Sequence, residues 1–321
     1  MKISAIICEF NPFHNGHEYL ISRAKEINGC NKVVCVMSGS FTQRGDICRT
    51  DKYLRAKHAI LCGADAVIEL PAPFAVAPAE IFAQGAVKTV SAINAQTTIV
   101  FGCESCEDDG EFITAAEILC NESELFKTAL ERRLDSGESY IKSYAAAYAE
   151  CGGNPQTLAS PNNILGVEYV KAIARSAKEI DFAPVKRVGA GYNDTALSGR
   201  FSSASGIRAN AQAPEIKQVM PDCSYSDFIK STDNAERFER LAADYLYLCD
   251  KNDLKRVYGC TEGLENRLKS LAFGHSFEEI CELAATKRYS KSRIRRIITA
   301  NILNLYADQT QKFLNAPLPL K

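Results

Sequence analysis

The stretch Phe10-Asn11-Pro12-Phe13-His14-Asn15-Gly16-His17 decides the fold, because it separates two segments of different periodicity. The preceding residues 3–8 are mostly apolar and predict a buried β-strand. Residues 18–27 carry apolar side chains at helical spacing and predict an α-helix. Pro12 lacks a backbone donor and biases Asn11 away from helical angles, so the chain must turn before the helix. The local prediction is therefore strand, tight loop, helix.

The two histidines of this loop lie close to the expected helix N-terminus. Unpaired backbone N–H groups and the positive end of the helix dipole make that end a natural phosphate site. Imidazoles there can donate hydrogen bonds to a phosphoryl group during attack at a nucleotide α-phosphate. A histidine pair three residues apart also fits a metal site, a satisfied core pair or chance. We favour the phosphate site, because two of only four histidines share one loop with Pro and Gly.

The loop resembles the H-x-G-H signature of the nucleotidyltransferase and class I aminoacyl-tRNA synthetase superfamily. The fuller pattern resembles one family within it, the bacterial tRNA(Met) cytidine acetate ligases. Further stretches carry the resemblance, namely MSGSFTQRG (residues 37–45), GADAVIELP (63–71), SPNNILG (160–166) and TKRY (286–289). Because these stretches are spread over most of the chain, the resemblance is specific and not confined to one motif.

Composition limits the class of protein. At 321 residues, the chain is long enough for two domains with a core in each. Its formal net charge of −1 gives no overall attraction to nucleic acid. The thirteen cysteines are scattered and odd in number, so a reducing cytoplasm is the simplest setting. We expect no membrane association, because no signal segment or membrane-length apolar run is present. The single C-x-x-C, Cys103 to Cys106, is expected to be structural and not a zinc or redox site.

Strand and helix patterns alternate through the first part of the chain. We expect strands at residues 3–8, 33–37, 66–70, 97–101 and 182–188, with helices at 51–62, 79–93, 111–151 and 161–177. This alternation indicates a parallel sheet with right-handed crossovers, whose ligands bind beyond the carboxyl ends of the strands. Loops with His14, residues 38–45, Pro71 and Gly102 leave the strands at this edge and should converge on one cleft. An Asn at a helix start is usually only a cap, but here nucleotide contact by Asn162 or Asn163 is favoured.

Residues 202–208, Ser-Ser-Ala-Ser-Gly-Ile-Arg, follow a Gly- and Ser-rich segment that we expect to be a mobile loop. They resemble the second signature of the superfamily, with Ser205 where a Thr is expected. Hydroxyl groups at a helix start offer donors to phosphate, and Arg208 can hold the leaving pyrophosphate. Taken alone, the segment also fits an ordinary linker with a surface arginine. Together with the H-x-G-H loop, the active-site interpretation is favoured.

The remaining residues, from about 214, have helical patterns and should form a second domain. Within it, residues 287–296 contain six cations and no acid. Such a run is usually a solvated helix face. In a near-neutral protein, however, the local excess of charge favours contact with a phosphate backbone.

The resemblance implies a Rossmann-like α/β domain of the nucleotidyltransferase type at residues 1–213 and a helical tRNA-binding domain at 214–321. It also implies that ATP and acetate form acetyl-adenylate and pyrophosphate. The acetyl group then passes to the exocyclic amine of the wobble cytidine of elongator tRNA(Met), and AMP is released. ATP is a substrate that normally arrives with Mg²⁺, and no carboxylate cluster points to a metal held by the protein.

The resemblance assigns roles to individual residues. Catalysis is expected of His14, His17, Ser205 and Arg208. ATP binding is expected of Ile7, Cys8, Glu9, Phe10, Asn11, Pro12, Phe13, His14, Asn15, Gly16, His17, Gly102, Asn162, Asn163, Arg187 and Val188. Contact with tRNA is expected of Arg44, Lys287, Arg288, Lys291, Arg293, Arg295 and Arg296. Two other functions stay open: a nucleotidyltransferase acting on a small phosphorylated metabolite, and an RNA-binding protein that does not turn over ATP.

Overall fold

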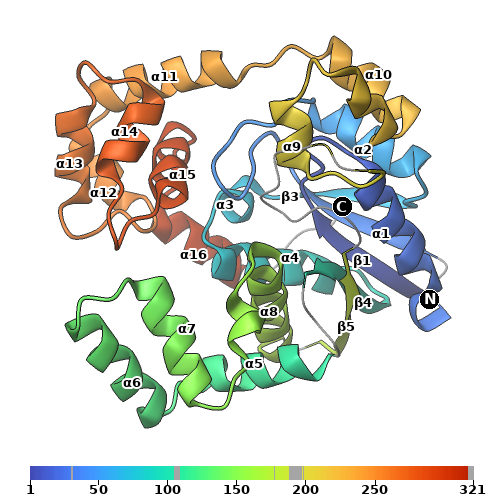
Figure 1. The fold of residues 1–321 in the computed structure, drawn as a ribbon, viewed down its shortest axis with the longest axis horizontal. Helices are drawn as coiled ribbons and strands as arrows, with labels where there is room; N and C mark the ends of the chain where they lie inside the picture. Colours follow the sequence, from blue (N-terminus) through green and yellow to red (C-terminus); the bar gives the residue numbers. More distant parts are fainter. Residues whose placement is uncertain (30–31, 105–108, 177, 188–196, 198, 317–321) are drawn as a thin grey trace.

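A single parallel sheet organises the N-terminal part of the chain (Figure 1). The computed structural model describes residues 1–29, 32–104, 109–176, 178–187, 197 and 199–316. The strands are β1 (Lys2–Cys8), β2 (Val33–Ser38), β3 (Ala66–Leu70), β4 (Gln96–Cys103) and β5 (Ile180–Lys186), in the order β3-β2-β1-β4-β5. All neighbouring strands are parallel, and Ile6 of β1 pairs with Cys35 on one side and Val100 on the other. The predicted α/β fold is confirmed.

Helices cover both faces of the sheet, because its strands are apolar on both sides. On one face, α1 (Asn15–Glu26) and α2 (Lys52–Leu61) pack over Cys35 and Val100. On the other face, α4 (Ala79–Ser91) and α8 (Pro161–Ala174) pack over Val36 and Ile99. The remaining helices of this part are α3 (Ala72–Ala75), α5 (Gly110–Cys120), α6 (Glu124–Asp135), α7 (Tyr140–Glu150), α9 (Ala204–Ala209) and α10 (Asp222–Lys230). Turns of 3-10 helix lie at Ile27–Gly29, Pro155–Leu158 and Pro214–Gln218.

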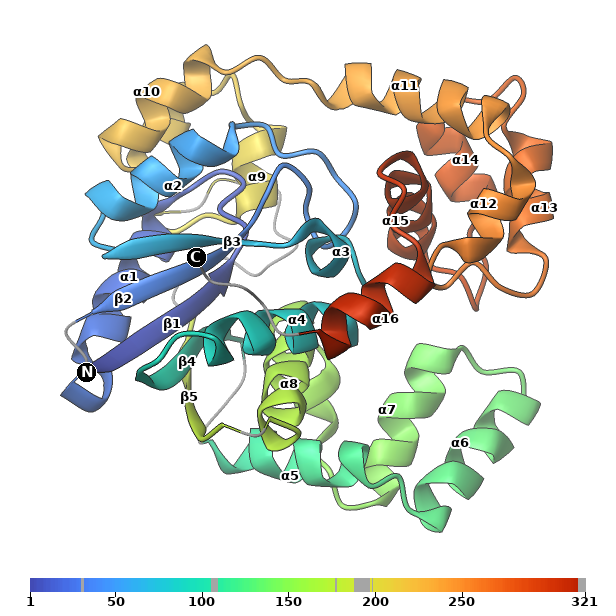
Figure 2. The same ribbon diagram turned by 180° about the vertical axis from the view of Figure 1, so that it is seen from behind.

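The C-terminal helices surround a second core. They are α11 (Ala235–Leu248), α12 (Lys251–Arg256), α13 (Leu264–Leu271), α14 (Phe277–Ala284), α15 (Lys291–Ile302) and α16 (Ala307–Asn315). Leu246, Leu268, Ile280 and Ile298 lie at the centre of this core and are fully buried. Helix α16 then returns to α3 and α4 (Figure 2).

Helix α10 belongs by its contacts with the sheet-containing part. It packs on α2, where His58 Nε2 lies 2.9 Å from Asp227 Oδ2. The Ser224 hydroxyl of α10 donates to the carbonyl of Phe13 at 2.8 Å. The change of core therefore falls between α10 and α11. The division at residues 213 and 214 stays a prediction, and this packing favours a boundary after α10.

Two predicted elements differ in their bounds. Strand β5 spans Ile180–Lys186 and not 182–188, because pairing with β4 already begins at Ile180, opposite Thr97. Pro184 is accommodated because β5 is an edge strand. Helix α8 ends at Ala174, about one turn before the predicted end at 177. Val188 and most of the expected mobile loop lie outside the described residues.

The cysteines differ from one expectation. A reducing cytoplasm keeps thiols free, and ten cysteines among the described residues are free thiols. Cys103, however, is disulfide-bonded, which that setting does not predict. Cysteine spacing does not show which thiols meet in three dimensions, and Cys106 lies outside the described residues. In the same described part of the chain, none of the helices combines the length and apolarity needed to cross a bilayer.

Candidate active site

The carboxyl ends of β1, β2, β4 and β5 place the predicted loops along one edge of the sheet (Figure 1). The loop after β1 carries the H-x-G-H residues and leads directly into α1, with His14 as the N-cap. Gly102 lies near the end of β4, and a Cβ there would be 3.4 Å from Arg187 Cγ. Arg187 follows β5, and its N–H donates to the carbonyl of Cys103 at 2.9 Å. These residues therefore lie together as predicted.

The two imidazoles form a capping box at the start of α1. His14 Nδ1 accepts the N–H of Gly16 at 3.1 Å, and His17 Nδ1 accepts the N–H of His14 at 3.3 Å. The rings stack with centroids 3.7 Å apart and planes inclined by 27°. Because each Nδ1 is an acceptor, the proton of each neutral ring lies on Nε2. Both rings therefore carry one N–H donor that is not used in capping.

Burial keeps these imidazoles neutral. It lowers the pKa of His14 to about 3, and the positive charges of Arg187 and Arg208 contribute to the shift. Burial also lowers the pKa of His17 well below its ordinary value, with smaller effects of His14 and Arg187. The site thus combines neutral hydrogen-bond donors with nearby guanidinium groups, an arrangement that suits an anionic ligand.

The second signature meets the first. Ser203 caps α9 by accepting the N–H of Gly206 at 2.9 Å, and its hydroxyl lies 3.0 Å from that of Ser205. From α9, Arg208 donates to the carbonyl of Asn11 in the histidine loop at 2.5 Å. Residues almost two hundred positions apart in the chain are thus in direct contact at the edge of the sheet.

The two asparagines at the start of α8 both contact Glu104, the residue after β4. Asn163 is fully buried, and its Oδ1 accepts the N–H of Glu104 at 2.9 Å. Asn162 donates through Nδ2 to the Glu104 carboxylate, which also accepts the hydroxyl of Ser160 at 2.6 Å. Asn163 therefore holds the end of β4, and Asn162 is the more accessible of the pair. Glu104 itself was not predicted.

Arg55 of α2 is a second residue that sequence reasoning missed. It is fully buried, and its guanidinium donates to the carbonyls of Glu9 at 2.5 Å, Ser38 at 3.1 Å and Thr50 at 2.9 Å, and also to that of Gly39. It thereby fastens the ends of β1 and β2 to each other. The signal in the sequence was the spacing, because Arg55 precedes His58 and Ala59 by three and four positions and therefore lies on the same, buried face of α2.

The cation run at residues 287–296, which ends in α15, is neutralised in part by acids from elsewhere in the chain. Arg295 is paired with Asp46 at 3.2 Å, Glu239 at 3.0 Å and Glu278. Lys291 pairs with Glu278 and Glu282, and Arg288 with Glu262. Lys287 donates to the carbonyl of Gly137 at 3.1 Å. The absence of acids within the run therefore did not show its true electrostatic environment.

Three other arginines form a distinct group, the Arg44–Arg293–Arg296 cluster. Arg293 donates to the carbonyl of Gly259 at 2.8 Å and lies over the ring of Tyr289. Arg296 donates to the carbonyl of Gln43 at 3.3 Å. Burial lowers the pKa of Arg296 to about 10, and the charges of Arg293 and Arg44 add to this effect. This cluster therefore brings like charges together beside the loop that follows β2.

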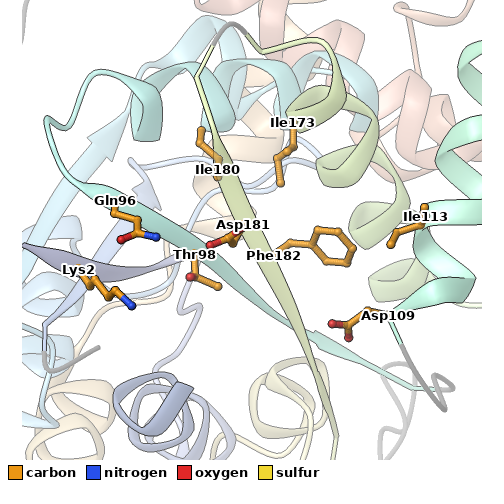
Figure 3. A pocket seen from close by; sticks show the side chains of 9 residues that line it. All are labelled: Lys2, Gln96, Thr98, Asp109, Ile113, Ile173, Ile180, Asp181 and Phe182. Carbon is orange, nitrogen blue, oxygen red and sulfur yellow. The ribbon is translucent and has the colours of Figure 1, made fainter. Parts of the chain in front are cut away.

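A hollow of about 570 Å³ is lined by residues of β1, β4, β5, α5 and α8. Figure 3 shows Lys2, Gln96 and Ile180 around it, at the amino ends of β1, β4 and β5. Ligands of such sheets bind at the opposite, carboxyl ends, so we do not assign the hollow to the nucleotide. Within the described residues, no three His, Cys, Asp or Glu side chains are grouped in a way that holds a metal ion.

Comparisons with known proteins agree with this geometry. The family model "HIGH Nucleotidyl Transferase" matches residues 1–320. The tRNA(Met) cytidine acetate ligase of Clostridium kluyveri is 37% identical over 93% of this chain and 78% of its own length. That of Clostridium perfringens is 36% identical over 96% of this chain and 80% of its own length.

Solved structures lead to the same family. Apo Thermotoga maritima TmcAL matches with a TM-score of 0.90 and 31% identity, over 99% of this chain and 79% of the other. The same protein bound with alpha-thio ATP matches with a TM-score of 0.86 and 30% identity, over 98% and 78%. The chain therefore belongs to the HIGH nucleotidyl transferase family and, within it, to the tRNA(Met) cytidine acetate ligases.

Proposed function

We infer that the protein is an ATP-dependent, AMP-forming ligase that acetylates the wobble cytidine of elongator tRNA(Met). The observation that carries this proposal is the pair of stacked, neutral imidazoles at the N-terminus of α1. Relatives 36–37% identical over most of the chain are named tRNA(Met) cytidine acetate ligase, which supports this activity over transfer of a nucleotide to a small metabolite.

In the first step, an acetate oxygen attacks the α-phosphorus of ATP and pyrophosphate leaves. The Nε2–H groups of His14 and His17 donate to the α-phosphoryl oxygens as negative charge grows on them. Backbone N–H groups at the start of α1 add to this stabilisation. Ser205 and Arg208 hold the pyrophosphate. The remaining ATP contacts fall to residues 7–17, Gly102, Asn162, Asn163, Arg187 and Val188.

ATP brings Mg²⁺ with it, bound to the phosphates, so the ion is part of the substrate. The cation would balance part of the phosphate charge, and Arg208 of α9 would balance more of it. We place the reaction in the cytoplasm, because both ATP and tRNA are available there.

The tRNA lies across the helical part of the molecule and the loop after β2. We propose that Arg44, Arg293 and Arg296 make the principal phosphate contacts, because Arg293 and Arg296 bond only to main-chain carbonyls among the interactions described above. Lys287, Arg288 and Lys291, which already have carbonyl or carboxylate partners, make secondary contacts with the tRNA. Arg295, with three carboxylate partners, serves mainly to hold α15 in place.

The decisive experiment incubates the protein with ATP, labelled acetate and elongator tRNA(Met), followed by nucleoside analysis. We expect labelled acetylcytidine and one AMP for each acetyl group transferred. A product that retains the nucleotide would instead support the small-metabolite nucleotidyltransferase. Salt-dependent tRNA binding without consumption of ATP would support the RNA-binding alternative. Either result would exclude the ligase.

The tRNA surface is tested separately by binding. Arg293→Gln should weaken tRNA binding and lower the slope of log K against log salt by about 1, as loss of one phosphate contact predicts. Arg240→Gln is the matched control, because Arg240 is an exposed arginine of α11 whose partner Glu236 is equally exposed. An unchanged slope in the Arg293 variant would remove this residue from the interface.

A further inference from the structure

Glu9 differs from the rest of the histidine loop, because it is a carboxylate at the carboxyl end of β1 among cations. Its Oε1 accepts the backbone N–H of Gln43 at 2.6 Å, which fixes the carboxylate in position. Arg44 and Arg208 both act on its charge, and none of the ion pairs found among the described residues includes Glu9. A fixed carboxylate without an ion-pair partner is available for proton transfer.

Phe10 links Glu9 to the rest of the histidine loop. The Glu9 carbonyl is held by Arg55 at 2.5 Å, and Phe10 follows with a left-handed φ of 52°. The ring of Phe10 packs against that of His17 with centroids 4.8 Å apart. A bulky residue in this region of φ is strained, and such strain persists only where the surroundings impose it. The backbone that joins Glu9 to the histidine loop is therefore held by its surroundings.

The second step of the proposed reaction needs a group of this kind. The exocyclic N4 of cytidine is conjugated with the base and must lose a proton as it acylates. Carboxylates are also the side chains that accept a hydrogen bond from cytosine N4. The ATP step needs no general base, because acetate is already deprotonated and the imidazoles and arginines stabilise phosphate charge.

We propose that Glu9 is the general base that accepts the N4 proton of the wobble cytidine during acetyl transfer. The bond between N4 and the acetyl carbon forms, and the bond from that carbon to the phosphate oxygen of acetyl-adenylate breaks. The electron pair of the broken bond leaves with AMP, and the proton passes to the Glu9 carboxylate and then to solvent. This inference rests on the proposed function.

The surroundings of Glu9 suit this role. Burial raises its pKa, with a further contribution from Asp46, whereas the Gln43 hydrogen bond and the charges of Arg208 and Arg44 act in the opposite direction. A raised pKa brings a carboxylate closer to the working pH, where general bases are most effective. Titratable groups that face it from neighbouring elements are Tyr169 of α8 and Cys48 of the loop after β2, and both have raised pKa values because they are buried.

The test separates the two steps in the Glu9→Gln variant, which keeps an acceptor for the Gln43 N–H. Acetate-dependent exchange between ATP and labelled pyrophosphate, without tRNA, measures the first step. Single-turnover transfer from preformed acetyl-adenylate to tRNA measures the second. Because Glu9 is also one of the expected ATP contacts, exchange is measured at saturating ATP, and we expect transfer to fall by about 10²–10⁴-fold and far more than exchange. The wild-type rate of transfer should also rise with pH through the Glu9 pKa, and the variant should lack this rise.

Glu80→Gln is the control, because it removes an exposed carboxylate of α4 that pairs with Arg175 at 3.1 Å. It should leave both steps unchanged. If Glu9→Gln lowers exchange and transfer equally, Glu9 only supports the structure, and the general-base role is excluded. Transfer at the wild-type rate excludes it as well. A wild-type protein that performs neither step would instead overturn the proposed function itself.

Discussion

Gly45 and Arg296 lie so close that a Cβ added to Gly45 would be 2.8 Å from the Cα of Arg296. Gly45 belongs to the loop after β2, and Arg296 to α15 of the helical part. The carbonyl of Gly45 accepts the hydroxyl of Thr299 at 2.8 Å, and Phe41 of the same loop packs against Phe238. The loop that leaves the nucleotide-binding edge is therefore also the surface on which α15 docks.

Gly45→Ala should consequently destabilise the protein. Its φ of 84° is unfavourable for alanine, and the added methyl group meets the backbone of α15, which cannot move aside easily. Gly274→Ala is the control, because Gly274 has a φ of 81° and nothing within 4 Å of the added Cβ. We expect the free energy of unfolding to fall by about 1–3 kcal/mol more in Gly45→Ala than in the control. Equal losses in denaturant titrations would show that the docking is loose.

The catalytic role of the imidazoles should be separable from their role in capping α1. His14→Asn keeps a side-chain acceptor for the Gly16 N–H, because Asn is a good N-cap, but it lacks the Nε2–H donor. We expect acetyl-adenylate formation to fall by about 10²–10³-fold, corresponding to roughly 3–4 kcal/mol for a lost transition-state donor. The thermal unfolding midpoint should change little. His275→Ala, on the loop before α14, should leave the rate unchanged, and an active His14→Asn enzyme would contradict the mechanism.

The same residues should make stability depend on pH. The pKa of His14 is about 3 in the folded protein, and burial also lowers that of His17, whereas both are near 6.5 when unfolded. Above pH 6.5 both states are neutral, and this contribution to stability is complete. As the pH falls below about 6.5, only the unfolded state takes up protons, so each imidazole costs up to about 1.4 kcal/mol per pH unit.

His17→Gln should therefore flatten the loss of unfolding free energy between about pH 6 and pH 4 by the equivalent of about one proton. Urea titrations of wild type and variant over this range measure the difference. A variant that loses stability as steeply as wild type would mean that His17 is protonated in the folded state.

The ion pairs of residues 287–296 should differ greatly in their importance. The Arg295 side chain is only 16% exposed and pairs with three carboxylates, whereas that of Arg288 is 73% exposed and pairs with one. Arg295→Met removes a largely buried guanidinium from three partly exposed carboxylates, of which Glu278 keeps Lys291, and should cost about 1–3 kcal/mol. Arg288→Met should cost no more than about 1 kcal/mol. Chemical denaturation of the two variants provides the comparison, and similar costs would show that Arg295 is effectively solvated.

Local sequence was sufficient for the elements that depend on local chemistry. The apolar runs of β1 to β4 and the helix expected from residue 51, which Asp51 caps, are present in the structure. Their periodicity and caps involve residues only a few positions apart, and such patterns are visible in one chain. The edge strand β5 was displaced because its register depends on pairing with β4 and not on its own pattern.

What the sequence determined by itself was a strand, a histidine loop and a helix at the mouth of a parallel sheet, together with the family. Only the tertiary structure decided the partners of the charged groups. It placed Asp46, Glu239 and Glu278 around Arg295, enclosed Arg55 among main-chain carbonyls, and left Glu9 without an ion pair among the described residues. The physical reason is that these contacts join residues far apart in the chain, and burial and charge act through space rather than along the sequence.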